Sequence, residues 1–513
     1  MSTKWRYAIG LTVVYFFLHL IVSSHYGISW DYHYHHYAGL YHLGISVPSI
    51  GSPAPVPFSP PDPRLTVEDP FGPFTQIIPS LSQVLFYEKL HILPFDIAYN
   101  LPMILIGSLG VGLLYLMLYE WIGVVAAFFG SLFLALLPMH FGYLHTNMKD
   151  VPNAFFFTLG VFLFWKLVHI NTLRNLFIAS ISFAVAFNTK INSIFIPVVC
   201  FFWLIISKKN EVLSFRNKRI LLYFILAPVF ALILWWPFWR DPLGKLLELP
   251  TFYSRNTLNM PVLFNREIIY SGVNIPWYYP FVYLVITTPI PILAAFFVGL
   301  VVSLKRFFGK NHIYSLILMW FFIPLVRYFL PKTSAIDGVR HFMEVIYPLS
   351  ALSGIGISEV LKYLRLNRRV LICVWLLVFV ILGTNVFRFH PYETSFYNWI
   401  IGGTYGAWGK FDVDFWGTPQ KDAVSWLNTH APIDSVVHIV MAQSSASMYL
   451  RPDLQRYVNS KNYKESDYTV ILNKESFFAM YGLSAYLGEK TRKGTIVYEV
   501  ARENVPLVWV IKN

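Results

Sequence analysis

Cysteine and charged residues are scarce in this chain. Cys200 and Cys373 are its only cysteines, so the sequence offers neither a disulfide framework nor a cysteine metal site. Charged residues make up 13% of the 513 positions, whereas hydrophobic residues make up 56% and the mean hydropathy is +0.52. A soluble chain of this length needs far more polar surface, so the composition indicates a membrane protein.

The net charge of +13 does not indicate a nucleic-acid partner. The basic residues lie mainly in short connections between apolar segments, which is typical of membrane topology. We therefore expect no nucleic acid among the partners, and membrane lipids around the protein.

The apolar residues form about eleven segments near the roughly 20-residue length of a transmembrane helix. They are residues 6–24, 98–119, 122–140, 151–170, 174–189, 193–207, 219–238, 280–304, 312–330, 343–361 and 370–387. The short second-to-third and fifth-to-sixth connections leave open that one pair forms re-entrant pieces. No small-residue cleavage site follows the first segment, which predicts an uncleaved anchor. The fold class is thus a polytopic α-helical membrane protein.

The basic connections predict the orientation of the chain. They share one side of the membrane with Lys4 and Arg6, and comprise Lys208, Lys209, Arg216, Lys218 and Arg219, then Lys305, Arg306 and Lys310, then Lys362, Arg365, Arg368 and Arg369. By the positive-inside rule this side is cytoplasmic. The loop 25–97 and the tail 388–513 are then extracytoplasmic, and 1–387 forms the transmembrane domain.

The two extracytoplasmic segments differ in character. Residues 47–63 are too rich in proline for a helix or central strand and predict an extended flap, whereas 74–90 has the spacing of an amphipathic helix on the membrane surface. The tail predicts a small α/β domain, with a helix at 421–428, strands at 435–440 and 468–472, and a hairpin of 494–500 with 505–511.

Two carboxylates mark the edges of apolar segments. Asp31 follows the first segment and Asp150 precedes the fourth, so counting crossings places both on the extracytoplasmic face. Ionisable groups at a membrane edge are costly and suggest a functional site. The alternative is structural, because either residue could cap the start of a helix, Asp150 above all, since Val-Pro follows it.

Several motifs together resemble one family of enzymes. They are the acid after the first span, Lys149-Asp-Val-Pro152, Asn188-Thr-Lys190, Gly338-Val-Arg-His-Phe-Met-Glu-Val-Ile-Tyr-Pro348, and the tail from His390-Pro-Tyr-Glu to Phe411-Asp-Val-Asp-Phe-Trp-Gly417. The chain is similar in these to GT-C fold glycosyltransferases of family 39, which includes protein mannosyltransferases and lipid A aminoarabinose transferases. The resemblance implies transfer, with inversion, of a sugar from a polyprenyl-phosphate donor to an extracytoplasmic acceptor.

The residues themselves fit such chemistry. A carboxylate is needed to deprotonate the acceptor hydroxyl, and cations are needed to hold the leaving phosphate. The resemblance implies Asp31 as the general base, and Asp150 is expected to orient the acceptor, a metal or Asp31. Lys190 and Arg340 are candidate phosphate ligands, with Lys as a point charge and Arg as a bidentate fork, unless they merely extend to the interface.

Further candidates accompany these four residues. His341 could add a phosphate contact or be structural. Tyr32 stands where many family members carry a second acid, and it belongs to an aromatic stretch that could stack on sugars or form an interfacial belt. His341 and Tyr32 are therefore both candidate substrate-binding residues.

No cofactor is required by the sequence, and a divalent metal stays an open alternative. His33, His35 and His36 with Asp31 have ligand types suited to zinc or manganese, although their spacing is no recognised zinc signature. Asp412 and Asp414 resemble the acid pair of nucleotide-sugar transferases, but lie in an extracytoplasmic tail where such sugars are scarce.

A transporter or flippase of lipid-linked sugars is the alternative from another class. Coupled transporters tend to show paired half-sequences and ionisable groups at mid-membrane, whereas this chain has no apparent repeat and its charges gather outside. The sequence predicts a protein of the prokaryotic plasma membrane and leaves the sugar open. The acceptor could be a protein, a glycan or a lipid.

Overall fold

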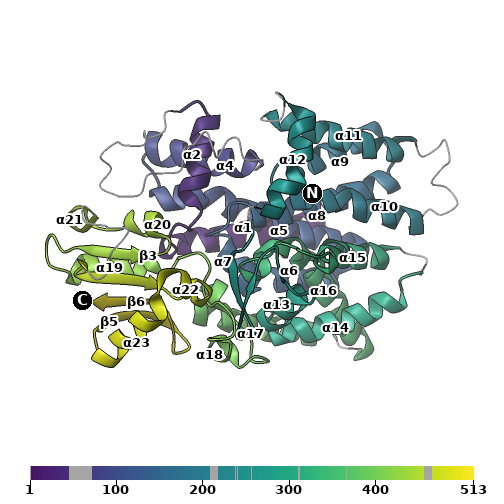
Figure 1. The fold of residues 1–513 in the computed structure, drawn as a ribbon. Helices are drawn as coiled ribbons and strands as arrows, with labels where there is room; N and C mark the ends of the chain where they lie inside the picture. The colour runs from purple at the N-terminus through teal and green to yellow at the C-terminus, as the bar shows by residue number, and fades with distance from the viewer. Residues whose placement is uncertain are drawn as a thin grey trace.

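The structure is a computed structural model that describes residues 2–45, 72–207, 218–236, 239, 241–255, 257–309, 312–365, 367–455 and 465–513. The proline-rich flap expected at 47–63 lies outside these residues. Before the tail, the main helices are α1 (Thr3–Val22), α2 (Tyr32–His42), α4 (Phe74–Gln83), α5 (Phe95–Trp121), α6 (Val124–Ala135), α7 (Pro138–Tyr143), α8 (Asp150–His169), α9 (Leu173–Phe187), α10 (Phe195–Ser207), α11 (Lys218–Leu234), α12 (Pro242–Arg255), α13 (Tyr279–Thr287), α14 (Ile290–Lys305), α15 (Ile313–Phe322), α16 (Ile346–Tyr363) and α17 (Arg368–Phe389) (Figure 1).

Each of the predicted apolar segments coincides with one or two of these helices. Five helical segments within the described chain are long and apolar enough to cross a membrane, namely Thr3–His25, Phe95–Trp121, Asp150–His169, Gly338–Tyr363 and Arg369–Phe389. Five more apolar helical segments have 10–17 residues. The polytopic helical fold is thereby confirmed, while the number of crossings stays a prediction.

Proline divides two of the segments that were expected to be single helices. The segment 122–140 breaks into α6 and α7 before Pro138, and 280–304 breaks into α13 and α14 before Pro289. In both cases the residue before the proline is extended, with ψ of 115° at Leu137 and 129° at Thr288. Proline disfavours helical geometry in the preceding residue and has no N–H to donate, so the helix ends there.

Small residues allow the helices of the bundle to approach closely. A Cβ atom on Gly299 of α14 would lie 1.8 Å from the carbonyl oxygen of Leu352 in α16, and one on Gly356 of α16 would lie 1.9 Å from that of Ala295. Glycine at these two positions is therefore required for α14 and α16 to pack as they do, as is common between membrane helices.

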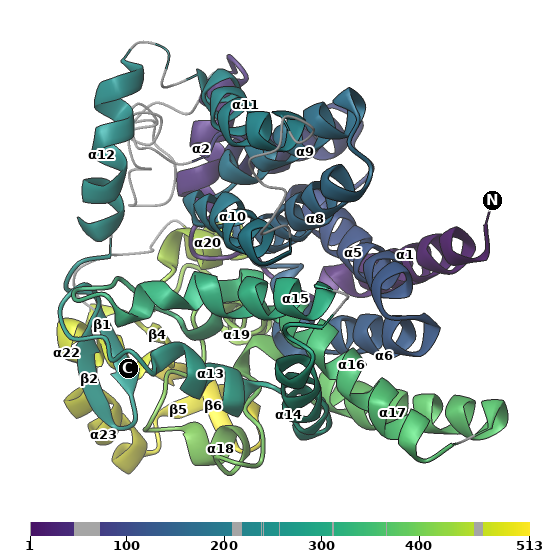
Figure 2. The same ribbon diagram turned by 90° about the vertical axis from the view of Figure 1, so that its right-hand side faces the viewer.

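The segment 239–279, between two predicted spans, contains elements that the sequence did not predict. These are α12 and a two-stranded hairpin of β1 (Pro261–Phe264) and β2 (Glu267–Tyr270). Figure 2 shows α12 standing at the edge of the bundle. The amphipathic helix expected at 74–90 is present as α4, which continues into a π-helical turn at Val84–Lys89.

The tail forms the expected α/β domain, at the left of Figure 1. Its sheet has the order β3-β4-β6-β5, in which β3 (Val437–Val440) is parallel to β4 (Tyr468–Leu472) and the β4–β6 and β6–β5 pairs are antiparallel. The predicted terminal hairpin is β5 (Ile496–Arg502) with β6 (Val505–Lys512). The helices are α18 (Gly403–Ala407), α19 (Gln420–His430), α20 (Gln443–Ser447), α21 (Pro452–Gln455), α22 (Phe478–Tyr481) and α23 (Leu483–Lys493).

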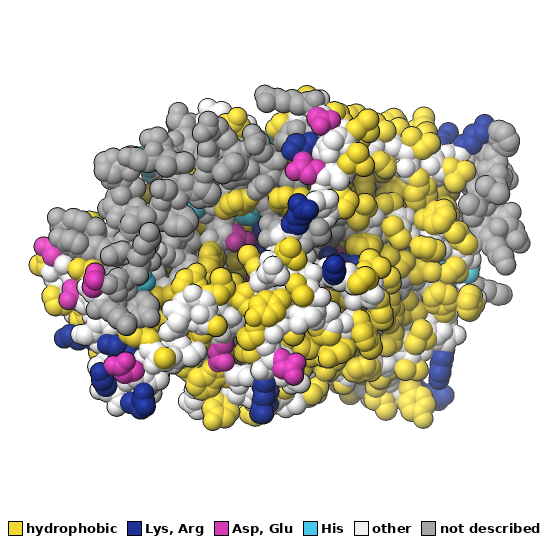
Figure 3. All heavy atoms as spheres, viewed as in Figure 1, with side chains coloured by type: hydrophobic (Ala, Val, Ile, Leu, Met, Phe, Trp, Pro, Cys, Tyr) yellow, Lys and Arg dark blue, Asp and Glu magenta, His cyan; other side chains and the backbone are white. Residues whose placement is uncertain are grey.

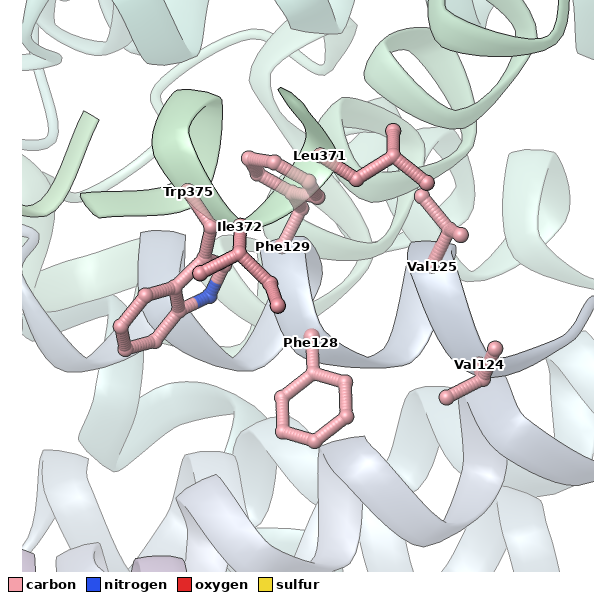
Figure 4. Close-up of a pocket in the computed structure, with 7 residues that line it drawn as sticks. All are labelled: Val124, Val125, Phe128, Phe129, Leu371, Ile372 and Trp375. Carbon is pink, nitrogen blue, oxygen red and sulfur yellow. The ribbon is translucent and has the colours of Figure 1, made fainter. Parts of the chain in front are cut away.

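The surface follows this division into two parts. In Figure 3 hydrophobic side chains dominate the right-hand part, whereas many of the charged ones lie over the tail domain at the left. Helix α17 contributes strongly to the apolar surface, because only 11% of its most apolar 18-residue stretch is buried. A groove of about 270 Å³ separates α17 from α6 and is lined by Val124, Val125, Phe128, Phe129, Leu371, Ile372 and Trp375 (Figure 4).

Candidate functional site

A cluster of charged side chains joins four segments that are far apart in the sequence. Asp31 immediately precedes α2, Lys149 and Asp150 lie at the start of α8, Lys190 follows α9, and Arg340 lies in the short helix Gly338–Val345 before α16. Ion pairs connect all five. The starts and ends of several helices therefore meet at one charged centre.

Asp31 is the partly exposed carboxylate of this centre. Its Oδ2 atom lies 3.1 Å from Nζ of Lys149 and 3.2 Å from Nη2 of Arg340, while 32% of its side chain is exposed. Its side chain makes no capping hydrogen bond with the backbone of α2, so the structure does not support the helix-cap interpretation. Burial alone would raise the pKa of Asp31, but Lys149 and Arg340 outweigh it and hold this pKa well below its usual range.

Asp150 is buried and fully engaged. Its Oδ1 atom accepts from Nζ of Lys190 at 2.5 Å, and its Oδ2 accepts from Nδ2 of Asn147 at 2.6 Å and lies 3.5 Å from Nε of Arg340. Only 1% of the Asp150 side chain is exposed. This carboxylate therefore holds two cations in place and is closed to an acceptor.

Arg340 is the most connected cation of the centre. Besides Asp31 and Asp150 it contacts Asp337, whose Oδ2 accepts from Nη1 at 2.7 Å. The indole ring of Trp416, from the tail domain, lies 4.3 Å from the guanidinium carbon. Three carboxylates and an aromatic face thus fix the plane of the guanidinium, as is usual for arginine at phosphate-binding sites.

A pocket of about 480 Å³ opens beside these residues, and its wall is rich in positive charge. The cationic side chains that line it are Lys149, Lys190, Arg327, Lys332 and Arg340, against the single carboxylate of Asp150. Its other charged or polar lining includes His341, Asn192, Thr189 and Thr257. Ligand pockets are typically of this size, and this lining favours an anion.

The candidates from the sequence divide into two groups. The structure brings Asp31, Asp150, Lys190, Arg340 and His341 to the charged centre or its pocket. Tyr32, in contrast, is buried in a small apolar cluster beside α5, where its hydroxyl pairs with the side-chain amide of Gln83. The roles expected of all six residues stay predictions.

Sequence reasoning missed several residues that contact the centre, line its pocket or pair with a residue that does. Among them are Lys149, Arg327, Asp337, Trp416 and Lys474. Lys149, Asp337 and Trp416 lie in or next to the quoted motifs, so proximity was a usable signal for them. Nothing in the sequence connects Lys474 to Asp337, 137 residues earlier.

The metal hypotheses gain no support from the geometry. Across the described ranges, no three His, Cys, Asp or Glu side chains are placed to hold a metal ion. His36 instead pairs through Nδ1 with Oγ of Ser80, at 3.1 Å, and stacks on Tyr32. Asp414 accepts the backbone N–H groups of Trp416 and Gly417, so it shapes the turn that carries Trp416.

Several known proteins resemble this chain in sequence or in structure. Residues 95–236 match the family model described as dolichyl-phosphate-mannose-protein mannosyltransferase. The structure is similar to that of ArnT from Cupriavidus metallidurans bound to undecaprenyl phosphate, with a TM-score of 0.52 and 14% identity over 99% of this chain and 98% of that one. The chain has the GT-C fold of these glycosyltransferases. Its resemblance to the protein mannosyltransferase and ArnT type is confirmed.

The structure is also similar to that of an oligosaccharyltransferase. The oligosaccharyltransferase of Archaeoglobus fulgidus, in its apo form, aligns with a TM-score of 0.51 and 12% identity, over 90% of this chain and 65% of that one. No curated protein sequence matches the chain. At such identities the structural matches establish the fold, and the family model covers only residues 95–236.

Proposed function

We propose that this protein is a glycosyltransferase that takes its sugar from a polyprenyl-phosphate donor and passes it, with inversion, to a hydroxyl of an acceptor on the extracytoplasmic side. The observation that carries the proposal is the cation-lined pocket beside the partly exposed carboxylate of Asp31. Transfer to a hydroxyl needs a base and a stabilised leaving phosphate at neighbouring positions. The undecaprenyl phosphate bound to the similar ArnT structure supports a donor of this chemical class.

In this proposal the acceptor oxygen attacks the anomeric carbon of the sugar. The bond between that carbon and the phosphate oxygen breaks, and the phosphate leaves with the electron pair. The hydroxyl proton passes to Oδ1 of Asp31, because the ion pairs with Lys149 and Arg340 both use Oδ2. Lys190 and Arg340, held by Asp150, neutralise the leaving phosphate.

The donor also prepares the base in this scheme. Lys149 and Arg340 both contact Oδ2 of Asp31 and both line the pocket, so a phosphate in the pocket competes with Asp31 for them. When Lys149 and Arg340 pair with the phosphate instead of with Asp31, the pKa of Asp31 rises towards its usual range and the carboxylate becomes a better base. Acceptor activation thus follows donor binding.

The test is consumption of donor by the purified protein. Incubation with a polyprenyl-phosphate sugar should release polyprenyl phosphate, detected by mass spectrometry, and the Asp31→Asn variant should release far less. Movement of intact lipid between leaflets of a vesicle, without release of polyprenyl phosphate, would instead support the transporter. Comparison of surface glycans from cells with and without the protein would then identify sugar and acceptor.

A further inference from the structure

A chain of ion pairs runs from the tail domain into the charged centre. Nζ of Lys474, which follows β4, pairs with Oδ1 of Asp337, and the other oxygen of Asp337 accepts from Arg340 at 2.7 Å. Arg340 in turn contacts Asp31 at 3.2 Å. Two carboxylates and two cations therefore alternate between the tail domain and the proposed base.

Lys474 is a buried cation that the catalytic scheme does not yet use. Its side chain is 4% exposed, and its ammonium group lies 4.8 Å from the ring centre of Phe477 and 5.4 Å from that of Phe415. A buried ammonium is costly unless a carboxylate pairs with it, and among described residues its ion-pair partner is Asp337. Lys474 and Asp337 are thus tied to one another.

The backbone fixes Asp337 between its two cations. Asp337 has a φ of +54° and Gly338 a φ of +62°, both in the left-handed region. The N–H of Gly338 donates to the hydroxyl of Tyr279 at 3.1 Å, and a Cβ at position 338 would lie 3.1 Å from the ring of Tyr283. Non-glycine residues are held in this region only when their surroundings demand it, often at functional sites.

We propose that Lys474 is a positioning residue for the donor phosphate, acting through Asp337 on Arg340. While Lys474 neutralises one oxygen of Asp337, Arg340 interacts with a phosphate in the pocket as well as with Asp337, Asp31 and Asp150. Without Lys474, the uncompensated Asp337 attracts the guanidinium more strongly and draws it from the phosphate. The inference rests on the proposed function, and it makes the tail domain part of the donor site.

Trp416 supports the same conclusion from a second position in the tail. Its ring packs on the guanidinium of Arg340, and Phe415, its neighbour, packs on Lys474. The loop 411–417 therefore lies against both cations of the chain. The tail domain thus holds Arg340 by charge and by ring contact.

The experiment compares Lys474→Met with Lys474→Arg in the full-length purified protein. Lys474→Met should raise the KM for the polyprenyl-phosphate sugar by about tenfold, within the range of couplings in one ion-pair network, with a smaller change in kcat. Lys474→Arg should retain most donor affinity because it keeps the charge. Lys493→Met, which removes an exposed lysine of the same domain, is the matched control.

A double variant separates positioning from general stability. Because Lys474 acts through Asp337, the KM of Lys474→Met with Asp337→Asn should be no higher than that of Lys474→Met alone, and this pair leaves no unpaired buried charge. A higher KM in the double variant, or an unchanged KM in Lys474→Met, would overturn the inference. If Arg340→Lys also leaves the KM unchanged, it is the phosphate role of Arg340 in the proposed function that fails.

Discussion

Lys149 and Asp150 are consecutive residues whose side chains form ion pairs in different directions. Lys149 pairs with Asp31 at 3.1 Å, and Asp150 pairs with Lys190 at 2.5 Å. The first turn of α8 therefore connects the start of α2 with the segment after α9. Substitutions at these positions should have distinct effects, because one pair contains the proposed base and the other holds a proposed phosphate ligand.

Asp31→Asn should lower turnover by about 100-fold to 10,000-fold, since it removes the general base. Binding of polyprenyl phosphate should be retained or tightened, because the amide competes less for Lys149 and Arg340 than the carboxylate does. Turnover and binding should be measured on the same purified sample, with Asp453→Asn as a control for removal of an acid elsewhere. Near-normal turnover would reject Asp31 as the base.

Asp150→Asn should reduce catalysis less than Asp31→Asn but weaken donor binding. Asp150 is closed to an acceptor and holds Lys190 and Arg340, so its loss acts on the phosphate ligands. Lys190→Met should weaken donor binding in the same way. Donor titration of both variants tests this expectation, and wild-type affinity in Lys190→Met would show that this lysine serves packing alone.

Arg340→Lys should weaken donor use although it conserves charge. A single ammonium cannot reproduce the guanidinium fork or its contact with the ring of Trp416. We expect a higher KM for donor with little loss of thermal stability. Donor kinetics combined with thermal unfolding would check this, and an unchanged KM would remove Arg340 from the donor site.

Asp414 predicts a pH dependence of stability in the tail domain. Burial raises its pKa to about 6, although the N–H groups of Gly417 and Trp416 oppose this shift. Between the ordinary value of about 3.9 and this one, the folded chain holds a proton that the unfolded chain has released, so stability falls as pH rises through the window.

The Asp414→Asn variant should therefore lose less thermal stability than the wild type between pH 4 and pH 6. Asparagine keeps an oxygen for the N–H groups of Trp416 and Gly417 but does not titrate. Melting temperatures of both proteins at several pH values in this range provide the measurement. Parallel pH profiles would show that Asp414 does not titrate in the folded state.

The orientation of the chain can be tested directly. A tag after Asn513 should be accessible to protease from outside the cell, whereas a tag before Met1 should be protected, because the basic connections indicate a cytoplasmic N-terminus. A protected C-terminal tag would contradict the odd number of crossings, and the sides of the membrane predicted for Asp31 and Asp150 would have to be reassigned.

Much of the fold could be predicted because its signals are local. Long apolar segments gave the helices of the bundle, and runs such as Tyr468–Leu472 gave the strands of the tail. Helix α12 was missed because its stretch of sequence is short and only moderately apolar, and the hairpin of β1 and β2 because its strands have four residues each. The helix breaks before Pro138 and Pro289 could have been predicted, because proline disfavours helical geometry in the preceding residue.

The candidate site was predictable only in part. Membrane-edge charges such as Asp31 and Lys190 are visible in sequence because ionisable groups there are rare. Lys474 sits in a polar domain where lysine is ordinary, so its pairing with Asp337 depends on tertiary structure. The packing of Tyr32 against Tyr99 and Met103 likewise depends on tertiary structure, and its role in substrate binding stays a prediction.

Helix α17 links this chemistry to the thickness of the membrane. Its 22 residues extend about 33 Å, close to the roughly 30 Å of a hydrocarbon core, and few protein contacts oppose its tilting. It leads directly into His390, which contacts His25 and Glu393 at the junction with the tail domain. A bilayer of unsuitable thickness would tilt α17 and strain this junction. We therefore expect the chain length of the surrounding lipids to act on this junction.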